Sequence, residues 1–233
     1  MFDVRPVGYL VGLMVTAMGA TMALPLLVDI AEGRGHWSVF AESMIVTCMI
    51  GALVALACKN SVGKGLTIQQ AFLLTTLVWV MLPLFGALPF MLGETDLHFI
   101  DAFFESMSGV TTTGSTVIAG LDDLPKGLLL WRGILQWLGG LGIVIVALVF
   151  LPEMRVGGMQ FFRSEGFDTF GKALPRTIDI SKGVLNVYLG LTLICTLTYL
   201  VLGMGAFEAT VHALTTVSTG WFSSKDASFA AFP

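Results

Sequence analysis

The sequence has 233 residues, of which 55% are hydrophobic and 12% are charged, and its formal net charge is −4 at pH 7. A soluble domain carries about twice that share of charged residues because its surface faces water. The composition, with a mean hydropathy of +0.86, therefore excludes an ordinary soluble protein and predicts an integral membrane protein with lipid as its surroundings. The acidic balance argues against nucleic acid as a partner.

Five apolar runs divide the chain, and each is about 20 residues long, enough for a helix to cross roughly 30 Å of hydrocarbon. They cover residues 7–28, 39–58, 70–92, 128–151 and 184–204. Pro25 interrupts the first run near its end. Pro83 and Pro89 lie in the third run, where a membrane bundle tolerates proline better than a soluble helix does.

The basic residues predict on which side of the membrane each loop lies. With a cytoplasmic N-terminus, eight basic residues fall on the inner side and four on the outer side or at span edges, as the positive-inside rule requires. The inner set is Arg5, Lys59, Lys64, Arg155, Arg163, Lys172, Arg176 and Lys182, and the outer set is Arg34, Lys126, Arg132 and Lys225. Acidic residues lean toward the outer side, where they either attract cations or are ordinary solvated loop residues.

The segment between the third and fourth runs, residues 93–127, predicts a re-entrant loop. Its apolar piece, residues 97–110, forms about four helical turns and is too short to cross a membrane. TTTGST (111–116) follows, in which extended Thr residues can direct carbonyls one way and Gly114 can adopt angles closed to other residues. Rings of carbonyl oxygens replace the hydration shell of potassium. For this string alone, an ordinary extracellular loop is the alternative.

The same pattern recurs after the fifth run. A short apolar segment, residues 207–214, leads into TTVSTGWFS (215–223), and placing residues 217–220 over 111–114 aligns VSTG with TTTG, 106 residues apart. Such recurrence is typical of a pore built from internal repeats. The predicted fold is an all-α membrane protein with repeats of span, re-entrant pore loop and span after a two-span N-terminal leader. The predicted units are the leader (1–66), the first repeat (67–153), a cytoplasmic connector (154–183) and a second repeat truncated after its pore loop (184–233).

Three segments resemble the membrane subunit of Trk-type potassium uptake systems, in the superfamily that includes Ktr and plant HKT transporters. They are DAFFESMSGVTTTGST (101–116), LLLWRGILQWLGGLGIVIV (128–146) and HALTTVSTGWFS (212–223), and the resemblance covers essentially the whole chain. It implies four span–pore loop–span repeats around one central pore, through which K+, or K+ and Na+, passes without any cofactor. The filter residues implied here are Thr111, Thr112, Thr113, Gly114, Val217, Ser218, Thr219 and Gly220.

The resemblance also implies the surroundings of the chain. A multi-pass protein of the bacterial cytoplasmic (inner) membrane with a cytoplasmic N-terminus is expected, as a homodimer of the full-length protein with a cytoplasmic nucleotide-binding regulatory subunit. The basic connector, residues 154–183, is either a docking surface for that subunit or a plain connector at the headgroups. Family members are usually much longer, so we expect this chain to be the N-terminal half of a longer protein.

One position departs from the family pattern, which typically reads Gly-Gly-Phe where this sequence reads Gly220, Trp221 and Phe222. If Trp221 aligns with the filter glycine, an indole replaces a residue that is needed for its backbone freedom. If Gly220 aligns with it, Trp221 packs behind the filter.

Several residues in and around the predicted pore have two interpretations each. Glu105 either hydrogen-bonds the loop backbone and braces the filter or is exposed to solvent, and Asp101 is expected near the outer vestibule. Gly139, Gly140 and Gly142 mark either a close helix contact or a bend.

Two other classes of function are open from the residues alone. A membrane enzyme would need a nucleophile and a base, and the best set is Ser106 or Ser108 with His98 or His212, without supporting spacing. A non-conducting structural subunit would need no filter-like loops. No transition-metal site and no disulfide is expected, because the histidines lack ligand partners and the cysteines lie inside apolar runs.

Overall fold

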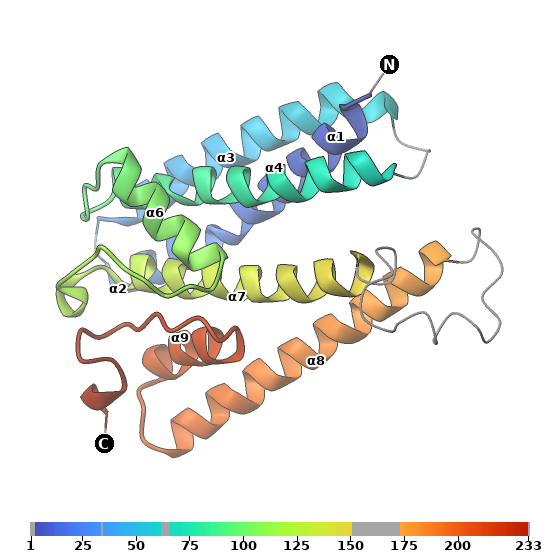
Figure 1. The fold of residues 1–233 in the computed structure, drawn as a ribbon. Helices are drawn as coiled ribbons and strands as arrows, with labels where there is room; N and C mark the ends of the chain where they lie inside the picture. The colour runs from blue at the N-terminus through green and yellow to red at the C-terminus, as the bar shows by residue number, and fades with distance from the viewer. Residues whose placement is uncertain (1–2, 34, 62–65, 151–172, 233) are drawn as a thin grey trace.

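The computed structural model describes residues 3–33, 35–61, 66–150 and 173–232, and every regular element in these ranges is a helix. Long helices lie side by side, while the short helices α6 and α9 lie at one end of the protein near α7 (Figure 1). In chain order the α-helices are α1 (Arg5–Thr21), α2 (Ala23–Glu32), α3 (Trp37–Cys58), α4 (Ile68–Gly86), α5 (Leu88–Leu92), α6 (Phe99–Val110), α7 (Lys126–Phe150), α8 (Ala173–Val201) and α9 (Ala206–Val217).

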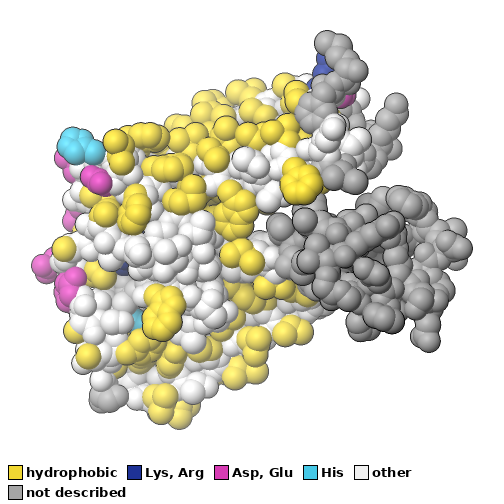
Figure 2. Space-filling model, in the orientation of Figure 1, with side chains coloured by type: hydrophobic (Ala, Val, Ile, Leu, Met, Phe, Trp, Pro, Cys, Tyr) yellow, Lys and Arg dark blue, Asp and Glu magenta, His cyan; other side chains and the backbone are white. Residues whose placement is uncertain are grey.

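Within the described residues, five segments are long and apolar enough to cross a membrane. They are Arg5–Glu32, Trp37–Cys58, Gln69–Leu92, Lys126–Val144 and Lys182–Val201, and they confirm the five predicted spans. On the face drawn in Figure 2, hydrophobic side chains cover much of the area between the two ends, and acidic side chains gather at the end where α6 lies. The protein is a multi-pass membrane protein.

The first span consists of two helices, which meet at Met22 rather than at the proline itself. Pro25 has no N–H to donate to the carbonyl four residues earlier, at Thr21, so the regular ladder ends there. At the same place the Met22 N–H donates to the carbonyl three residues earlier, at Gly19, over 3.1 Å, and not to the carbonyl four residues earlier. The proline therefore acts one turn before its own position.

A second proline break separates α4 from α5 at Ala87. Pro89 lies in the first turn of α5, and the Phe90 N–H donates to the Ala87 carbonyl at 3.0 Å. The Gly86 carbonyl thereby lacks its usual helical partner, and it accepts a hydrogen bond from Trp131 Nε1 of α7 at 2.9 Å. Backbone groups at membrane depth need such partners, so the break attaches α4 to α7.

The first two spans pack closely against each other through small residues. A Cβ atom on Gly12 of α1 would lie 2.7 Å from the Gly51 carbonyl of α3 and 2.6 Å from the Ala55 nitrogen. Glycine at such contacts lets two membrane helices approach each other closely. α1 and α3 are therefore a tightly packed helix pair.

The end of the first span also anchors the start of α7. Asp29 of α2 is buried, and its carboxylate accepts a hydrogen bond from the Gly127 N–H and bonds to His36 Nδ1, both at 2.7 Å. Lys126 pairs with Glu32 at the same place. A carboxylate is favoured at the start of a helix because the first N–H groups lack partners and the helix dipole is positive there.

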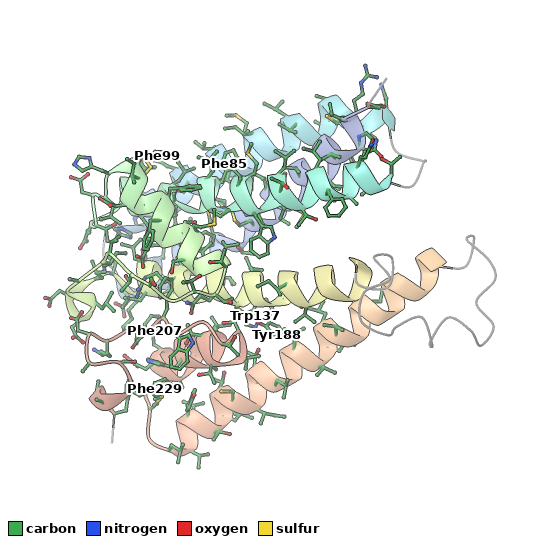
Figure 3. The ribbon with its side chains drawn as sticks, viewed as in Figure 1. Phe85, Phe99, Trp137, Tyr188, Phe207 and Phe229 are labelled. Atoms are coloured by element: carbon green, nitrogen blue, oxygen red, sulfur yellow. The ribbon has the colours of Figure 1, made fainter. Side chains whose placement is uncertain are left out.

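The fifth predicted span lies in α8, which already begins at Ala173, before residue 184. Residues 154–172 of the predicted connector lie outside the described residues. α8 contacts α7 through Tyr188 and Trp137, whose ring centroids are 5.1 Å apart (Figure 3). The Tyr188 hydroxyl donates to the Trp137 carbonyl at 3.1 Å, and Trp137 Nε1 donates to the Thr192 hydroxyl at 2.9 Å.

Candidate functional site

The first part of the site is α6 with the loop that follows it, residues 111–120, here called the first loop. α6 packs against α4 and α7, and its 12 residues are too few to cross a membrane. The chain reverses directly after the helix at Thr112, which has a left-handed conformation with φ 57°. The Thr113 N–H closes this turn by donating to the Ser108 carbonyl at 2.9 Å.

The second part, α9 with residues 218–227 (the second loop), repeats this backbone at a spacing of 107 residues. α9 also has 12 residues, and Gly205 before it shares φ −59° and ψ 153° with His98 before α6. Thr219 has φ 56°, within a degree of its counterpart Thr112. Two segments of different sequence therefore form the same helix and turn.

The closing hydrogen bond and the next unusual residue recur at the same spacing. The Gly220 N–H donates to the Thr215 carbonyl at 2.7 Å, which is the counterpart of the bond made by Thr113. Two residues beyond each left-handed threonine, a second left-handed residue follows: Gly114 with φ 80° and Trp221 with φ 68°.

This structural register corrects the alignment made from the sequence, which was wrong by one residue. The alignment paired residues 217–220 with 111–114, but Val217 is the last residue of α9, as Val110 is of α6. Trp221 and Gly114 are the true counterparts. The sequence alignment matched glycine to glycine because a bulky residue is not expected at positive φ. Of the two alternatives for Trp221, the structure supports the one in which it takes the glycine position.

The two loops meet at these left-handed residues. A Cβ atom on Gly114 would lie 2.5 Å from the Gly220 carbonyl oxygen and 2.6 Å from the Cβ of Trp221, so only glycine permits this approach. The Trp221 side chain is 83% exposed. The structure thus brings together the glycine ends of the two predicted motifs.

A buried side chain holds each loop against its own helix. Glu105 of α6 is fully buried; it accepts a hydrogen bond from the Val117 N–H at 3.0 Å and lies 2.9 Å from the Thr116 hydroxyl. The prediction that Glu105 bonds the loop backbone is confirmed. Its counterpart in α9 is His212, whose Nε2 bonds to the hydroxyl of Ser223, the counterpart of Thr116, at 3.0 Å.

Arg132 of α7 links the two loops to each other. Its Nε donates to Glu105 at 2.9 Å and one terminal nitrogen donates to the Thr116 hydroxyl at 3.0 Å. The other terminal nitrogen donates to the Ser223 carbonyl at 2.8 Å, and the guanidinium lies 4.1 Å from the centre of the Phe222 ring. Sequence reasoning counted Arg132 only as an outer positive charge. An ionisable residue inside an apolar run is the signal that could have identified it.

Adjacent glycines of α7 receive the ends of the two short helices. A Cβ atom on Gly139 would collide with the Val110 carbonyl of α6, and one on Gly140 would lie 2.9 Å from the Ser218 side chain after α9. These contacts confirm the close-packing interpretation for both residues. Gly142 has nothing within 4 Å of the same position.

The residues considered for an enzyme are not arranged as a nucleophile and base. Ser106 and Ser108 are buried in α6, whereas both ring nitrogens of His212 are bonded elsewhere, one to a backbone carbonyl of α9 and one to Ser223. His98 lies at the exposed start of α6. In the described part of the chain, no group of three or more His, Cys, Asp or Glu side chains could hold a metal ion.

Comparisons with known proteins agree with one another. A family model described as TrkH, a cation transport protein, matches residues 36–233. The chain is 42% identical over 211 residues to the Trk system potassium uptake protein TrkI of Halomonas elongata, and 39% identical over 231 residues to TrkH of Escherichia coli K12. It is also similar to the crystal structure of the potassium transporter TrkH from Vibrio parahaemolyticus, with a TM-score of 0.84 at 34% identity.

These matches cover nearly all of this chain but less than half of each relative. They cover 91% of this chain against TrkI, 98% against the Escherichia coli protein and 99% against the solved structure. The corresponding shares of those proteins are 43%, 48% and 46%. Because the family model matches far more than half of the chain, the chain belongs to the TrkH family of cation transport proteins.

Proposed function

We propose that this chain is the N-terminal part of a potassium uptake transporter, and that its two loops line part of the selectivity filter of a central pore. In this proposal, residues 1–66 are the leader, 67–153 and 184–233 are two pore-forming repeats, and 154–183 is a cytoplasmic connector. The family consists of transport proteins, so a membrane enzyme is not supported.

The observation that carries the proposal is the contact between two helix–loop segments of the same backbone at Gly114 and Trp221. Repeated loops that meet around an axis can place carbonyl oxygens in rings, which substitute for the hydration shell of K+. The proposed filter residues are Thr111, Thr112, Thr113 and Gly114 with their counterparts in the structural register, Ser218, Thr219, Gly220 and Trp221. Val217, which the sequence alignment included, is the last residue of α9 and is left out of the set. The Gly220 carbonyl accepts a hydrogen bond from Gln136 of α7. Gly220 therefore contributes to the loop through its lack of a side chain, and not through its carbonyl.

The buried side chains described above suit such a filter. Glu105, His212 and Arg132 fix the loops from behind, so the backbone can keep its shape when an ion replaces water. Loops that were merely extracellular connectors would not need three buried ionisable side chains to hold them, and such groups are rare inside membranes.

We further propose that the protein lies in the bacterial inner membrane with its N-terminus in the cytoplasm. The basic residues then lie mainly inside, and the acidic end seen in Figure 2 faces outward, where it concentrates cations. By resemblance, a homodimer of the full-length protein and a cytoplasmic nucleotide-binding regulatory subunit are the proposed partners.

The test is growth of an uptake-deficient bacterium at low potassium when it carries the full-length gene. We expect growth with the unaltered gene and loss of growth with Gly114→Ala, because a methyl group there collides with the second loop. Gly120→Ala is the matched control: Gly120 also has positive φ, but nothing lies within 4 Å of its Cβ position, so growth should persist.

Trp221→Gly gives a second test of the same filter. It restores the residue that the register predicts at this position, and it should support growth at least as well as the unaltered gene. If neither the unaltered gene nor Trp221→Gly restores growth, although both proteins are found in the membrane, the proposed potassium function is wrong.

A further inference from the structure

The side chain of Gln136, in the middle of α7, bonds to the backbone on both sides of Trp221. Gln136 is fully buried. Its Nε2 donates a hydrogen bond to the Gly220 carbonyl, and its Oε1 accepts one from the Phe222 N–H at 3.2 Å. One amide from the helix of the first unit thus holds two peptide groups of the second loop.

These two bonds determine where the Trp221 carbonyl points. The peptide bonds described here are trans, and in a planar trans peptide the C=O and N–H groups point in opposite directions. The Phe222 N–H points at Gln136 of α7, so the Trp221 carbonyl, in the same peptide group, points away from α7. The second loop therefore presents this carbonyl on its other side.

Trp221 needs such support more than its counterpart does. A bulky residue at φ 68° is a strained outlier that persists only where its surroundings fix it. The indole is 83% exposed, so its own packing does not supply that support. Gly114 adopts φ 80° without this strain because it has no side chain.

The fit between Gln136 and the loop is tight. A Cβ atom on Gly220 would collide with the Gln136 amide, so the loop carries glycine at the point where the amide reaches it. The amide is also specific in chemistry, since only a group with both a donor and an acceptor satisfies a carbonyl and an N–H together.

We propose that the Trp221 carbonyl is an ion ligand of the filter and that Gln136 is the positioning residue that points it toward the ion. This inference rests on the proposed function and adds to it a ligand and the side chain that orients it. Gln136 acts from outside the ion pathway, through the two peptide groups beside Trp221.

The experiment compares Gln136→Leu with the unaltered full-length protein in proteoliposomes, with fluxes of K+ and Na+ divided by the amount of protein. We expect the preference for K+ over Na+ to fall about tenfold, which is the factor that one ordinary hydrogen bond is worth. Gln136→Met removes both the donor and the acceptor but keeps the length of the side chain, so the preference should fall about as far, and this variant decides the matter if the leucine variant does not fold. Trp137→Phe is the matched control, because Trp137 bonds to Thr192 of α8 rather than to a loop, and its preference should be unchanged.

Rescue distinguishes positioning from a general structural role. In a Trp221→Gly background, glycine adopts the left-handed conformation unaided, so Gln136→Leu should lower the K+ preference by a smaller factor there. An equal loss in both backgrounds, or no loss in either, would overturn the inference.

A parallel measurement does not depend on transport. Gln136→Leu should lower the melting temperature of the full-length protein in detergent more strongly with Trp221 than with Gly at that position. If the unaltered protein carries no K+, the proposed function fails, whereas the melting temperatures still report whether Gln136 holds Trp221. Equal shifts in both backgrounds would refute that hold.

Discussion

Glu105 of α6 and Arg132 of α7 form an ion pair with 2.9 Å between Oε1 and Nε, and neither side chain is more than 1% exposed. Because both groups are removed from water, each charge depends on the other and on its remaining hydrogen bonds. The pair also contacts the second loop, because Arg132 donates a hydrogen bond to the Ser223 carbonyl there.

Glu105→Gln leaves the Arg132 charge buried without its partner. We expect the free energy of unfolding of the full-length protein to fall by about 3 kcal/mol, the typical cost of breaking a buried pair on one side. Thermal unfolding in detergent measures it. Asp101→Asn, one turn earlier on α6 and only half-buried, is the control and should change the stability by less than about 0.5 kcal/mol. Equal stability of the two variants would contradict the role given to the pair.

Gly139→Ala tests the contact between α7 and the end of α6. The added methyl group would collide with the Val110 carbonyl, and we expect a loss of roughly 2 kcal/mol, as for other overpacked sites. Gly142→Ala adds the same methyl group on the same helix into open space, so it should stabilise the protein by up to about 1 kcal/mol through helix propensity. Unfolding of both variants in detergent gives the comparison; a stable Gly139→Ala protein would contradict the close packing.

Trp221→Gly should stabilise the full-length protein. Glycine removes backbone strain of about 1–3 kcal/mol at positive φ. It also raises the entropy of the unfolded chain, which lowers the free energy of unfolding by about 0.5–1 kcal/mol and offsets part of that gain. Little packing is lost because the indole is 83% exposed. We expect a net gain of about 1 kcal/mol in unfolding experiments. A clear loss of stability would mean that the indole makes contacts in the full-length protein that outweigh its backbone strain.

Asp122 and Lys225 connect the first loop region to the second at the acidic end, with 3.0 Å between Oδ1 and Nζ. The hydrogen bond from Lys225 lowers the pKa of Asp122 below its ordinary value. A carboxyl group whose pKa is lowered by folding stabilises the protein above its unfolded pKa, and this contribution is lost as the pH falls through the lowered value.

Asp122→Asn should therefore have a slightly lower melting temperature than the unaltered protein at pH 6, with the difference shrinking as the pH falls below about 4. The effect is small because solvent screens an exposed pair. Melting temperatures of both proteins between pH 3 and pH 7 test this, and a difference that stays constant over the range would show that the ion pair is not its cause.

Much of the fold could be predicted from the sequence because hydropathy is a local property. The length of an apolar run decides whether a helix can cross the membrane, so all five spans and the two short helices were predicted. The helix breaks at Met22 and Ala87 come before Pro25 and Pro89 in the chain, because proline removes a hydrogen bond from the helical turn that precedes it. The prolines were visible in the sequence, whereas the exact break depends on which carbonyl loses its partner.

The interior of the site could not be predicted in the same way. Arg132 and Ser223 are 91 residues apart in sequence, and only folding brings them together. The register of the second loop was left open between Gly220 and Trp221, because Trp221 occupies a conformation that sequence rules assign to glycine. Glu105 was predicted correctly because a carboxylate in a short membrane helix needs a partner nearby, and its own loop follows only a few residues later.

Because α7 follows the first loop yet contacts both loops, the two proposed repeats are not exchangeable parts. Arg132, Gln136 and Gly140 all lie in α7, within the first proposed repeat, and touch the second loop. A recombinant gene that took residues 184–233 from a relative would therefore face a helix selected for a different loop. Such a chimaera should work only when these three positions of α7 are taken from the same relative as the new segment. The sequences of α7 and of the second loop are therefore expected to change together in evolution.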